Sequence, residues 1–275
     1  SCVVHDTGRP VTKLLASIDE TTGDLALAKQ LGCDTFLLHH PLAGSARRDF
    51  SSVLDRMVGL IAEHGVPEEA ARDATADLRR RLRFNDHLSD WDHLASAAEL
   101  LDINLLNIHL AADELGRRIM LGALDPLPPD GTIDDAVPAL RTIPALAQPA
   151  NEIILVPDTP DAHGASAGPI AVMHAGGTNG GFPVASALFD HGVRTVLYIH
   201  CSGDDAKKLE DRRDAGHPGT LIVTGHLASD AIGMNKLLRH RATDHPSIEA
   251  VRHGGLRPFA PGCMSALRAP PPPVP

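Results

Sequence analysis

The sequence predicts an α/β fold of two related α/β lobes packed together, with a helical insert in the first lobe. Short apolar runs suited to buried strands alternate with segments of helical periodicity, an order typical of parallel sheets. Each half of the chain also repeats one succession of features. It reads strand, helix, strand ending in histidine, helical connection, strand, then a histidine with a carboxylate four residues later. A simple run of strand–helix units would look similar, and that alternative stays open.

The length of 275 residues allows one large domain or two modest ones. Proline enrichment between the two halves indicates where they divide. We expect a first lobe over 1–124 that includes the helical insert at 50–100, a proline-rich linker over 125–150, a second lobe over 151–260 and a proline-rich tail over 261–275.

Apolar periodicity and helix-ending glycines indicate the individual elements. Strands are expected at 13–18, 34–38, 104–109, 153–156, 169–174, 195–200 and 220–223. Helices are expected at 24–31, 53–64, 68–82, 91–100, from 111 onward, and at 183–189, 204–214 and 225–239.

The composition indicates a globular protein and argues against several partners. Hydrophobic residues make up 43% of the chain, which argues against wholesale disorder. Aromatic residues amount to only 3% and the formal net charge is −10, so we expect no nucleic-acid partner, since stacking platforms are few and phosphates are repelled. Histidine is the unusual component, with 16 residues. Imidazole is both the acid/base of physiological pH and the commonest metal ligand.

The cysteines and the start of the chain bear on location. The four cysteines are scattered without a CxxC pair, which predicts neither a disulfide framework nor a zinc knuckle. The first residues, Ser-Cys-Val-Val-His-Asp, do not match a signal peptide, and no run of about 18 apolar residues occurs. We therefore expect a cytoplasmic protein with no membrane partner.

Three histidine-containing segments lie at the ends of expected strands, where open α/β sheets bind their ligands. They are His39-His40, His109-Leu-Ala-Ala-Asp113 and His226-Leu-Ala-Ser-Asp230. Residues four apart on a helix share one face, so each histidine–aspartate pair can close around a cation. Each pair alone is a weak signal, because an ion pair on a helix surface accounts for most of them. Together they supply four imidazoles and two carboxylates.

The types of ligand indicate which metals to expect. Nitrogen and oxygen ligands without thiolate favour zinc, iron or manganese over calcium, magnesium or an iron–sulfur cluster. Six possible ligands exceed the three or four that one catalytic zinc uses, so we expect two divalent transition metal ions. Metal pairs of this kind activate water, which predicts hydrolysis.

These segments resemble the Nif-three-like (NGG-interacting-factor-three-like) family, also labelled GTP cyclohydrolase I type 2 homologs. The resemblance spans about residues 14–240 and rests on Ile18–Thr22, Asp34–Leu42, Asn107–Asp113, Gly176–Gly181 and Thr224–Asp230. It implies two related α/β lobes and a toroidal homohexamer. It also implies a dinuclear metal centre whose ligands are His39, His40, Asp113, His226 and Asp230, with His109 close by.

The chain departs from the family's pattern in two respects. Asp230 stands where the family usually has glutamate, which is one methylene longer and bears on how two metals are bridged. The insert at 50–100 is longer than in the shortest members, and the segment before the first strand is mostly absent. We expect these differences to alter the mouth of the site or the contacts between subunits of the homohexameric ring.

Other polar features are expected to have simpler roles. The turn Gly176–Gly181 fits neither a dinucleotide-binding nor a P-loop motif, so we expect a tight turn that opens a helix, with anion binding as the alternative. His174 and His200 are expected to be partly buried structural residues, with orientation of ligands or proton transfer as the alternative. Thr224 and Ser229 lack a nucleophile elbow, which argues against a serine hydrolase.

The leading hypothesis is a dinuclear-metal-dependent hydrolase of a small heterocyclic or nucleotide-like substrate. His109, or a histidine of the second lobe, would move protons. A non-catalytic ring protein that stores metal or regulates is the alternative, because ligands alone do not prove turnover. A nucleotide-binding module that uses the glycine turn is a third hypothesis.

Overall fold

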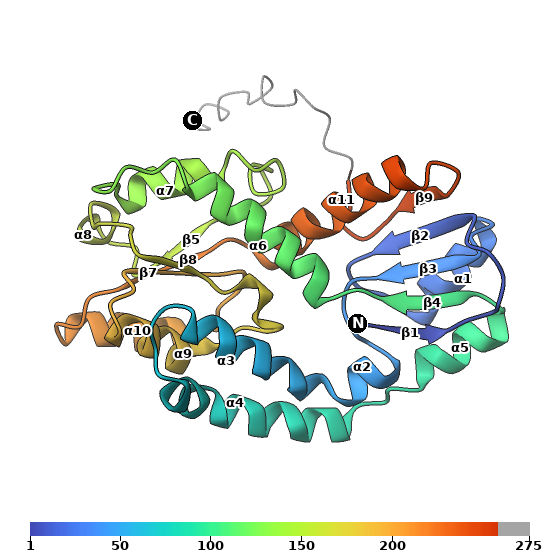
Figure 1. Ribbon diagram of the computed structural model, residues 1–275, viewed down its shortest axis with the longest axis horizontal. Helices are drawn as coiled ribbons and strands as arrows, with labels where there is room; N and C mark the ends of the chain where they lie inside the picture. Colours follow the sequence, from blue (N-terminus) through green and yellow to red (C-terminus); the bar gives the residue numbers. More distant parts are fainter. Residues whose placement is uncertain (258–275) are drawn as a thin grey trace, which may run out of the picture.

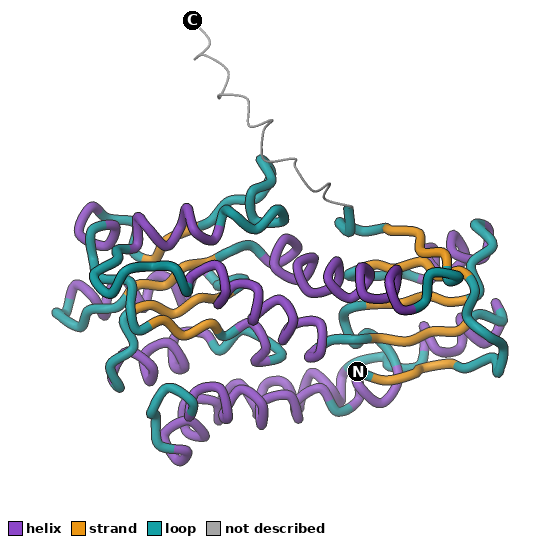
Figure 2. The backbone as a smooth tube through the Cα atoms, turned by 45° about the horizontal axis from the view of Figure 1, so that its top comes forward, coloured by secondary structure: helices purple, strands orange, loops and turns teal. Residues whose placement is uncertain are grey.

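The computed structural model describes residues 1–257 and contains two β-sheets at opposite ends of the molecule, with helices between and around them (Figures 1 and 2). Both sheets consist mainly of parallel strands. The predicted α/β class with two lobes is therefore confirmed. The predicted tail at 261–275 lies outside the described residues. Within residues 1–257, no helix is both long and apolar enough to cross a membrane.

The first sheet has the strand order β1-β4-β3-β2-β9. Its strands are β1 (Cys2–His5), β4 (Asn104–Asn107), β3 (Thr35–Leu38), β2 (Lys13–Ser17) and β9 (Glu249–Arg252). Only β1 runs antiparallel to its neighbour in this described sheet. One face packs against α1 (Thr22–Gln30) and α5 (His93–Leu101), and the other against α11 (His226–Asp244). Because β2, β3, β4 and β9 are parallel, their carboxyl ends lie together at one edge of the sheet. This edge faces the middle of the molecule (Figure 1).

The second sheet has the strand order β5-β8-β7-β6. Its strands are β5 (Ile154–Val156), β8 (Thr220–Val223), β7 (Thr195–Tyr198) and β6 (Ile170–Val172). Helices pack on both faces. They are α3 (Leu54–Ala62), α4 (Glu68–Leu88), α9 (Gly181–Asp190) and α10 (Gly203–Asp214) on one face, and α6 (Leu110–Leu124) and α7 (Ile133–Leu140) on the other. The short helices α2 (Gly44–Arg48) and α8 (Pro160–His163) and the 3-10 turns at Phe50–Val53 and His174–Gly176 complete the chain.

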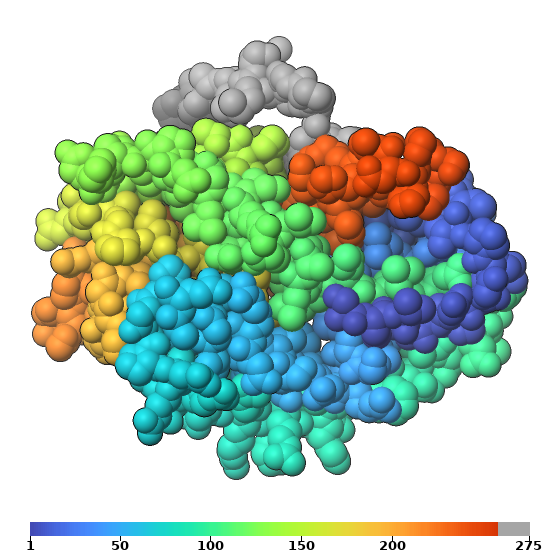
Figure 3. All heavy atoms as spheres, in the orientation of Figure 1, coloured from blue at the N-terminus to red at the C-terminus, as the bar shows by residue number. Residues whose placement is uncertain are grey.

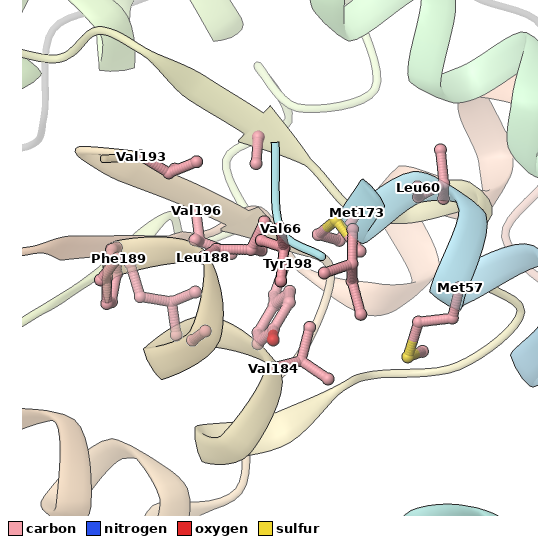
Figure 4. Packing of buried hydrophobic residues seen from close by; sticks show 14 of the residues in the cluster. Met57, Leu60, Val66, Met173, Val184, Leu188, Phe189, Val193, Val196 and Tyr198 are labelled. Atoms are coloured by element: carbon pink, nitrogen blue, oxygen red, sulfur yellow. The ribbon is translucent and has the colours of Figure 1, made fainter. Parts of the chain in front are cut away.

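Helices α3 and α4 of the expected insert belong to the core of the second lobe, although the sequence places them within the first, whereas α5 packs on the first sheet. Met57 and Leu60 of α3 are buried against Met173 and Tyr198 of the second lobe (Figure 4). Figure 3 shows the insert, in cyan, lying beside the yellow surface of that lobe. Apolar periodicity predicts a buried face on these helices but does not indicate which sheet covers it.

The carboxyl-terminal part of the second lobe also differs from the prediction. The expected second lobe extends over 151–260, yet β9 pairs in parallel with β2 of the first sheet. The reason is α11, whose 19 residues span about 28 Å and carry the chain from one sheet to the other. Ile232 on this helix packs in the core of the second lobe, whereas Met234 and Leu238 pack under the first sheet.

The expected linker over 125–150 is partly ordered as α7. Thr132 and Asp135 form a capping box at the start of this helix, each side chain bonding the other's backbone N–H. Ile133 and Leu140 are fully buried in the core of the second lobe. The segment therefore packs as part of that lobe.

Candidate metal centre

Residues that follow strands of both sheets line a cleft of about 330 Å³. His40, His109 and Asp113 come from the first sheet's side, and His226 and Asp230 from the second. His39 lies behind them, fully buried. The structure thus brings together all six residues that the sequence predicts for the site.

His39 and His40 follow β3 directly. Their backbone N–H groups donate to the carbonyl oxygens of Ser17 and Ile18, at 3.0 and 3.1 Å, so the parallel ladder with β2 extends to both residues. Pro41 follows, and the two imidazole rings lie with centroids 4.9 Å apart. The convergence expected at the strand end is therefore observed.

Each of these imidazoles is oriented through one ring nitrogen. Nδ1 of His39 donates to the carbonyl oxygen of Ile108 at 3.1 Å, and Nδ1 of His40 donates to Oδ1 of Asp19 at 2.6 Å. Nε2 of each ring is thereby directed into the cluster. Metal-binding histidines have this arrangement, since the bonded nitrogen fixes the ring and the tautomer.

The other ligands come from the first turns of α6 and α11. His109 precedes α6 and Asp113 lies one turn later, with His109 Nε2 3.6 Å from Asp113 Oδ2. His226 is the first residue of α11, and its Nε2 lies 3.2 Å from Asp230 Oδ2. Gly225 enters this helix at φ +95°, and a β-carbon there would lie 2.2 Å from Asn151 Oδ1, so the entry requires glycine.

A close crossing of α6 and α11 brings the two aspartates together. A β-carbon on Gly233 of α11 would lie 1.9 Å from the carbonyl oxygen of Ala112 on α6. Glycine at this position lets the backbones of the two helices touch. The contact lies next to Asp113 on α6 and one turn from Asp230 on α11. Each carboxylate then reaches His39, whose Nε2 is 3.3 Å from Asp113 Oδ1 and 3.6 Å from Asp230 Oδ1.

The donor atoms are suited to a cation. Three overlapping groups of residues could each hold an ion, because within each group the ligand atoms lie within 4.8 Å of one another. The groups are His39, His40 and His109; His40, His226 and Asp230; and His39, Asp113 and Asp230. His39 Nε2, Asp113 Oδ1 and Asp230 Oδ2 are buried and make no hydrogen bond within the described chain. Buried polar atoms in folded proteins rarely lack a partner, and a bound ion can be that partner. These residues could therefore hold a metal ion.

The charge of the cluster also favours a cation. Burial lowers the pKa of His39, but the carboxylates of Asp113 and Asp230 outweigh it and raise this pKa to about 10. Burial opposes ionisation of Asp230, yet the imidazoles of His226, His39 and His40, within 3.6 Å of its carboxylate, hold its pKa well below the usual range. The carboxylate of Asp230 therefore stays negative and favours a positive charge beside it.

Burial lowers the pKa of three histidines of the site, of which His174 and His200 lie outside the predicted ligand set. Burial lowers the pKa of His109 to about 4 and that of His200 to about 4, and it lowers the pKa of His174 as well. His174 is fully buried with no hydrogen bond to its ring from residues 1–257, and its Nε2 lies 3.9 Å from Asp113 Oδ1. His200 stacks at 4.6 Å from the ring of His226. Both His174 and His200 line the cleft. Their position therefore favours a role in the site, which the sequence left as the alternative to a structural role.

Sequence reasoning did not assign Asp19, Arg47 and Phe50 to the site. Asp19 bonds His40, and Arg47 and Phe50 line the cleft. Asp19 follows the carboxyl end of β2, and β2 pairs with β3, the strand that precedes His39 and His40. This position is a signal that could have identified Asp19. Arg47 and Phe50 gave none, because they reach the cleft only through the way α2 and the 3-10 turn at Phe50–Val53 fold. The glycine turn opens α9 at Gly181, as expected.

The fold and the site define a two-lobed α/β protein with a buried histidine–aspartate cluster that could bind metal. A NIF3 superfamily protein from Sphaerobacter thermophilus is 44% identical in sequence, and the match covers 90% of this chain and 88% of that one with a TM-score of 0.82. The chain belongs to the NIF3 superfamily, which confirms the resemblance found in its sequence.

More distant structures show weaker similarity. Reduced HcgD from Methanocaldococcus jannaschii is 12% identical, with 88% of this chain and 83% of that chain covered and a TM-score of 0.47. Protein SA1388 from Staphylococcus aureus is 13% identical, with 91% and 87% covered and a TM-score of 0.49. No protein-family profile and no curated protein matches the chain.

Proposed function

We propose that this protein is a dinuclear-metal-dependent hydrolase acting on a small heterocyclic or nucleotide-like substrate. The observation that carries the proposal is the position of Asp230. Its carboxylate belongs to two of the three candidate ligand groups, with Oδ2 facing His40 and His226 at 3.3 and 3.2 Å and Oδ1 facing His39. A carboxylate shared in this way is suited to bridge two ions.

The proposed ligands are the five residues that the sequence predicts. His40, His226 and Asp230 would hold one ion, and His39, Asp113 and the shared Asp230 the other. Imidazole and carboxylate ligands favour zinc, iron or manganese. When bound, a pair of such ions would supply Lewis-acid activation of water for hydrolysis.

The chain's own residues would bind substrate and move protons. The cleft of about 330 Å³ fits a small molecule and is lined by apolar as well as polar side chains. His109 borders the cleft, and its Nδ1 has no hydrogen-bond partner among the described residues, so we assign proton transfer to this ring. The carboxylate of Asp19 and the carbonyl of Ile108 would keep His40 and His39 in their orientations.

Turnover by metal-loaded protein tests this proposal. Nucleotides, cyclic amides and phosphoesters would be screened, and the active substrate would be used to compare His109→Gln with the parent. We expect kcat to fall about a hundredfold or more with unchanged metal content, because general acid–base catalysis contributes at least that much. Absence of turnover on all three substrate classes would reject the hydrolase.

A non-catalytic metal store or regulatory protein is the second candidate. The observation that favours it is the depth of the cluster, since His39, Asp113 and Asp230 are all buried. Asp113→Ala distinguishes the two functions. In a store this substitution changes only metal content, whereas in a hydrolase it also abolishes turnover.

We also propose that the protein acts as a cytoplasmic homo-oligomer, a hexameric ring by family resemblance. An apolar groove of about 420 Å³ lies beside α11 and β1, lined by Val3, Leu106, Ile108 and Leu237 among others. β1 is an edge strand, and exposed apolar edges of this kind are often covered by a partner. Light scattering of the purified protein measures the mass, and a monomer would reject the ring.

A further inference from the structure

Arg47 gives the cleft a permanent positive charge outside the histidine–aspartate cluster. It lies in α2, and it is the one lysine or arginine among the described residues that line this cleft. Its neighbours in sequence and space are engaged elsewhere. Arg48 lies 5.0 Å over the ring of Trp91, and Arg56 pairs with Glu63 at 3.1 Å and with Glu114 at 3.6 Å.

The hydrogen-bond donors of Arg47 are available to a ligand. Nη1 lies 3.8 Å from Oδ1 of Asp86, which is beyond hydrogen-bond distance, and the guanidinium makes no hydrogen bond to residues 1–257. Asp86 is itself buried and accepts a hydrogen bond from the backbone N–H of Ser51 at 2.8 Å. The carboxylate therefore holds the arginine in place while leaving its five N–H groups free.

The side chain of Arg47 is 27% exposed, and within residues 1–257 none of its nitrogen atoms is buried without a partner, so a ligand in the cleft can reach these donors. A planar fork of donors at the wall of a cleft matches a phosphate or a carboxylate, which can accept two parallel hydrogen bonds. Phe50 lies nearby in the same cleft, half-buried, with its ring centroid 5.7 Å from that of His109. This ring offers a flat apolar surface beside His109 in the cleft that Arg47 also lines.

We propose that Arg47 and Phe50 form a specificity subsite that binds an oxyanion attached to a planar ring. The substrate class would then be a small aromatic or heterocyclic molecule with a phosphate or carboxylate group. This inference rests on the proposed function, because it assigns the cleft beside the cluster to substrate. Arg47 determines specificity through binding, and the chemistry stays with the residues of the cluster.

Binding of three probes to metal-loaded protein tests the subsite. Phenylphosphonate and benzoate carry an oxyanion on a planar ring and represent the two oxyanion sources, and benzamide is the uncharged counterpart of benzoate. Calorimetry would give Kd for each probe with the parent, with Arg47→Gln, and with the matched control Arg48→Gln, which changes charge equally beside the cleft. Arg47→Lys restores the charge without the fork, and metal content is measured in every protein.

We expect Arg47→Gln to weaken phenylphosphonate, benzoate or both by about tenfold, the usual loss for a charge-assisted hydrogen bond. Benzamide should bind equally to all variants, Arg48→Gln should match the parent, and Arg47→Lys should recover part of the loss. The anion that responds identifies the oxyanion source. If both anions bind Arg47→Gln as tightly as the parent, the subsite is rejected. A parent that takes up no metal rejects the proposed function instead, and the Arg47 comparison is still measurable.

Discussion

Asp230 is the residue of the cluster whose carboxylate faces three imidazoles. It is buried, three imidazoles lie within 3.6 Å of its carboxylate, and a fourth belongs to the adjoining group. The sequence could predict its partners because residues 226 and 230 share a helix face and residues 39 and 40 end a strand. It could not predict Arg47, whose position depends on contacts between segments distant in the chain.

Glu20 is a second buried carboxyl group, outside the cluster. Only 8% of the residue is exposed, and neither of its oxygens has a hydrogen-bond partner in residues 1–257. Burial, with repulsion from Asp24 and Asp19, raises its pKa from 4.5 to about 8. The folded chain therefore keeps a proton that the unfolded chain releases. The stability from this proton is complete below pH 4.5 and is lost as the pH rises to about 8.

We predict that Glu20→Gln raises the free energy of unfolding relative to the parent, and that this gain is much larger at pH 8 than at pH 5. Glutamine keeps the shape of the side chain without the charge that the folded state cannot solvate. Urea unfolding at both pH values measures the difference. Glu99→Gln, at an exposed position of α5, serves as the control and should show no such change. An equal gain at both pH values would mean that Glu20 does not hold the proton.

At the scale of elements, the crossing of α6 and α11 determines whether the two halves of the site meet. We predict that Gly233→Ala lowers the free energy of unfolding by about 2–3 kcal/mol, the usual cost of overpacking, because the added carbon meets the Ala112 backbone. It should also reduce metal uptake by separating Asp113 from Asp230. Gly122→Ala on α6 is the control, since its β-carbon has no atom within 4 Å.

The control should be neutral or stabilise by about 0.5–1 kcal/mol, because alanine favours helix. Urea unfolding and elemental analysis of both variants provide the two measurements. Gly233→Ala with the stability and metal content of Gly122→Ala would show that the helices do not cross as closely as described.

The insert is the second element with a decisive role. Leu60 on α3 is 1% exposed in the core of the second lobe, whereas Leu100 on α5 is 87% exposed. We predict that Leu60→Ala lowers the free energy of unfolding by about 3 kcal/mol and that Leu100→Ala changes it by less than about 0.5 kcal/mol. Denaturant unfolding checks both. Equal effects would mean that the insert is only loosely attached to the second lobe.

Elements with strong local signals were predictable, and elements defined by distant pairing were not. The strands before His39 and His109 are short apolar runs, and each is found at the expected place. β1 and β9 are edge strands of the first sheet with few buried residues, so their sequences lack a clear apolar pattern. Their pairing depends on where α11 and the first sheet meet.

At the scale of the whole molecule, the site exists only because two lobes face one another. The first lobe supplies His39, His40 and the start of α6, and the second supplies the start of α11. The repeated order of the two halves predicts similar lobes but not their orientation. The glycine at 233 and the length of α11 fix that orientation through packing that appears only in three dimensions.

Metal content per protomer tests the central claim, which is that this cluster binds two divalent transition metal ions. Elemental analysis would be made on protein purified without a metal-affinity column. The parent and the control His163→Gln, a half-buried histidine that pairs with Asp134 away from the cluster, should contain two ions. Asp230→Asn should contain at most one, because the substitution removes the shared carboxylate charge. A parent without transition metal, or an Asp230→Asn variant with undiminished content, would contradict the account.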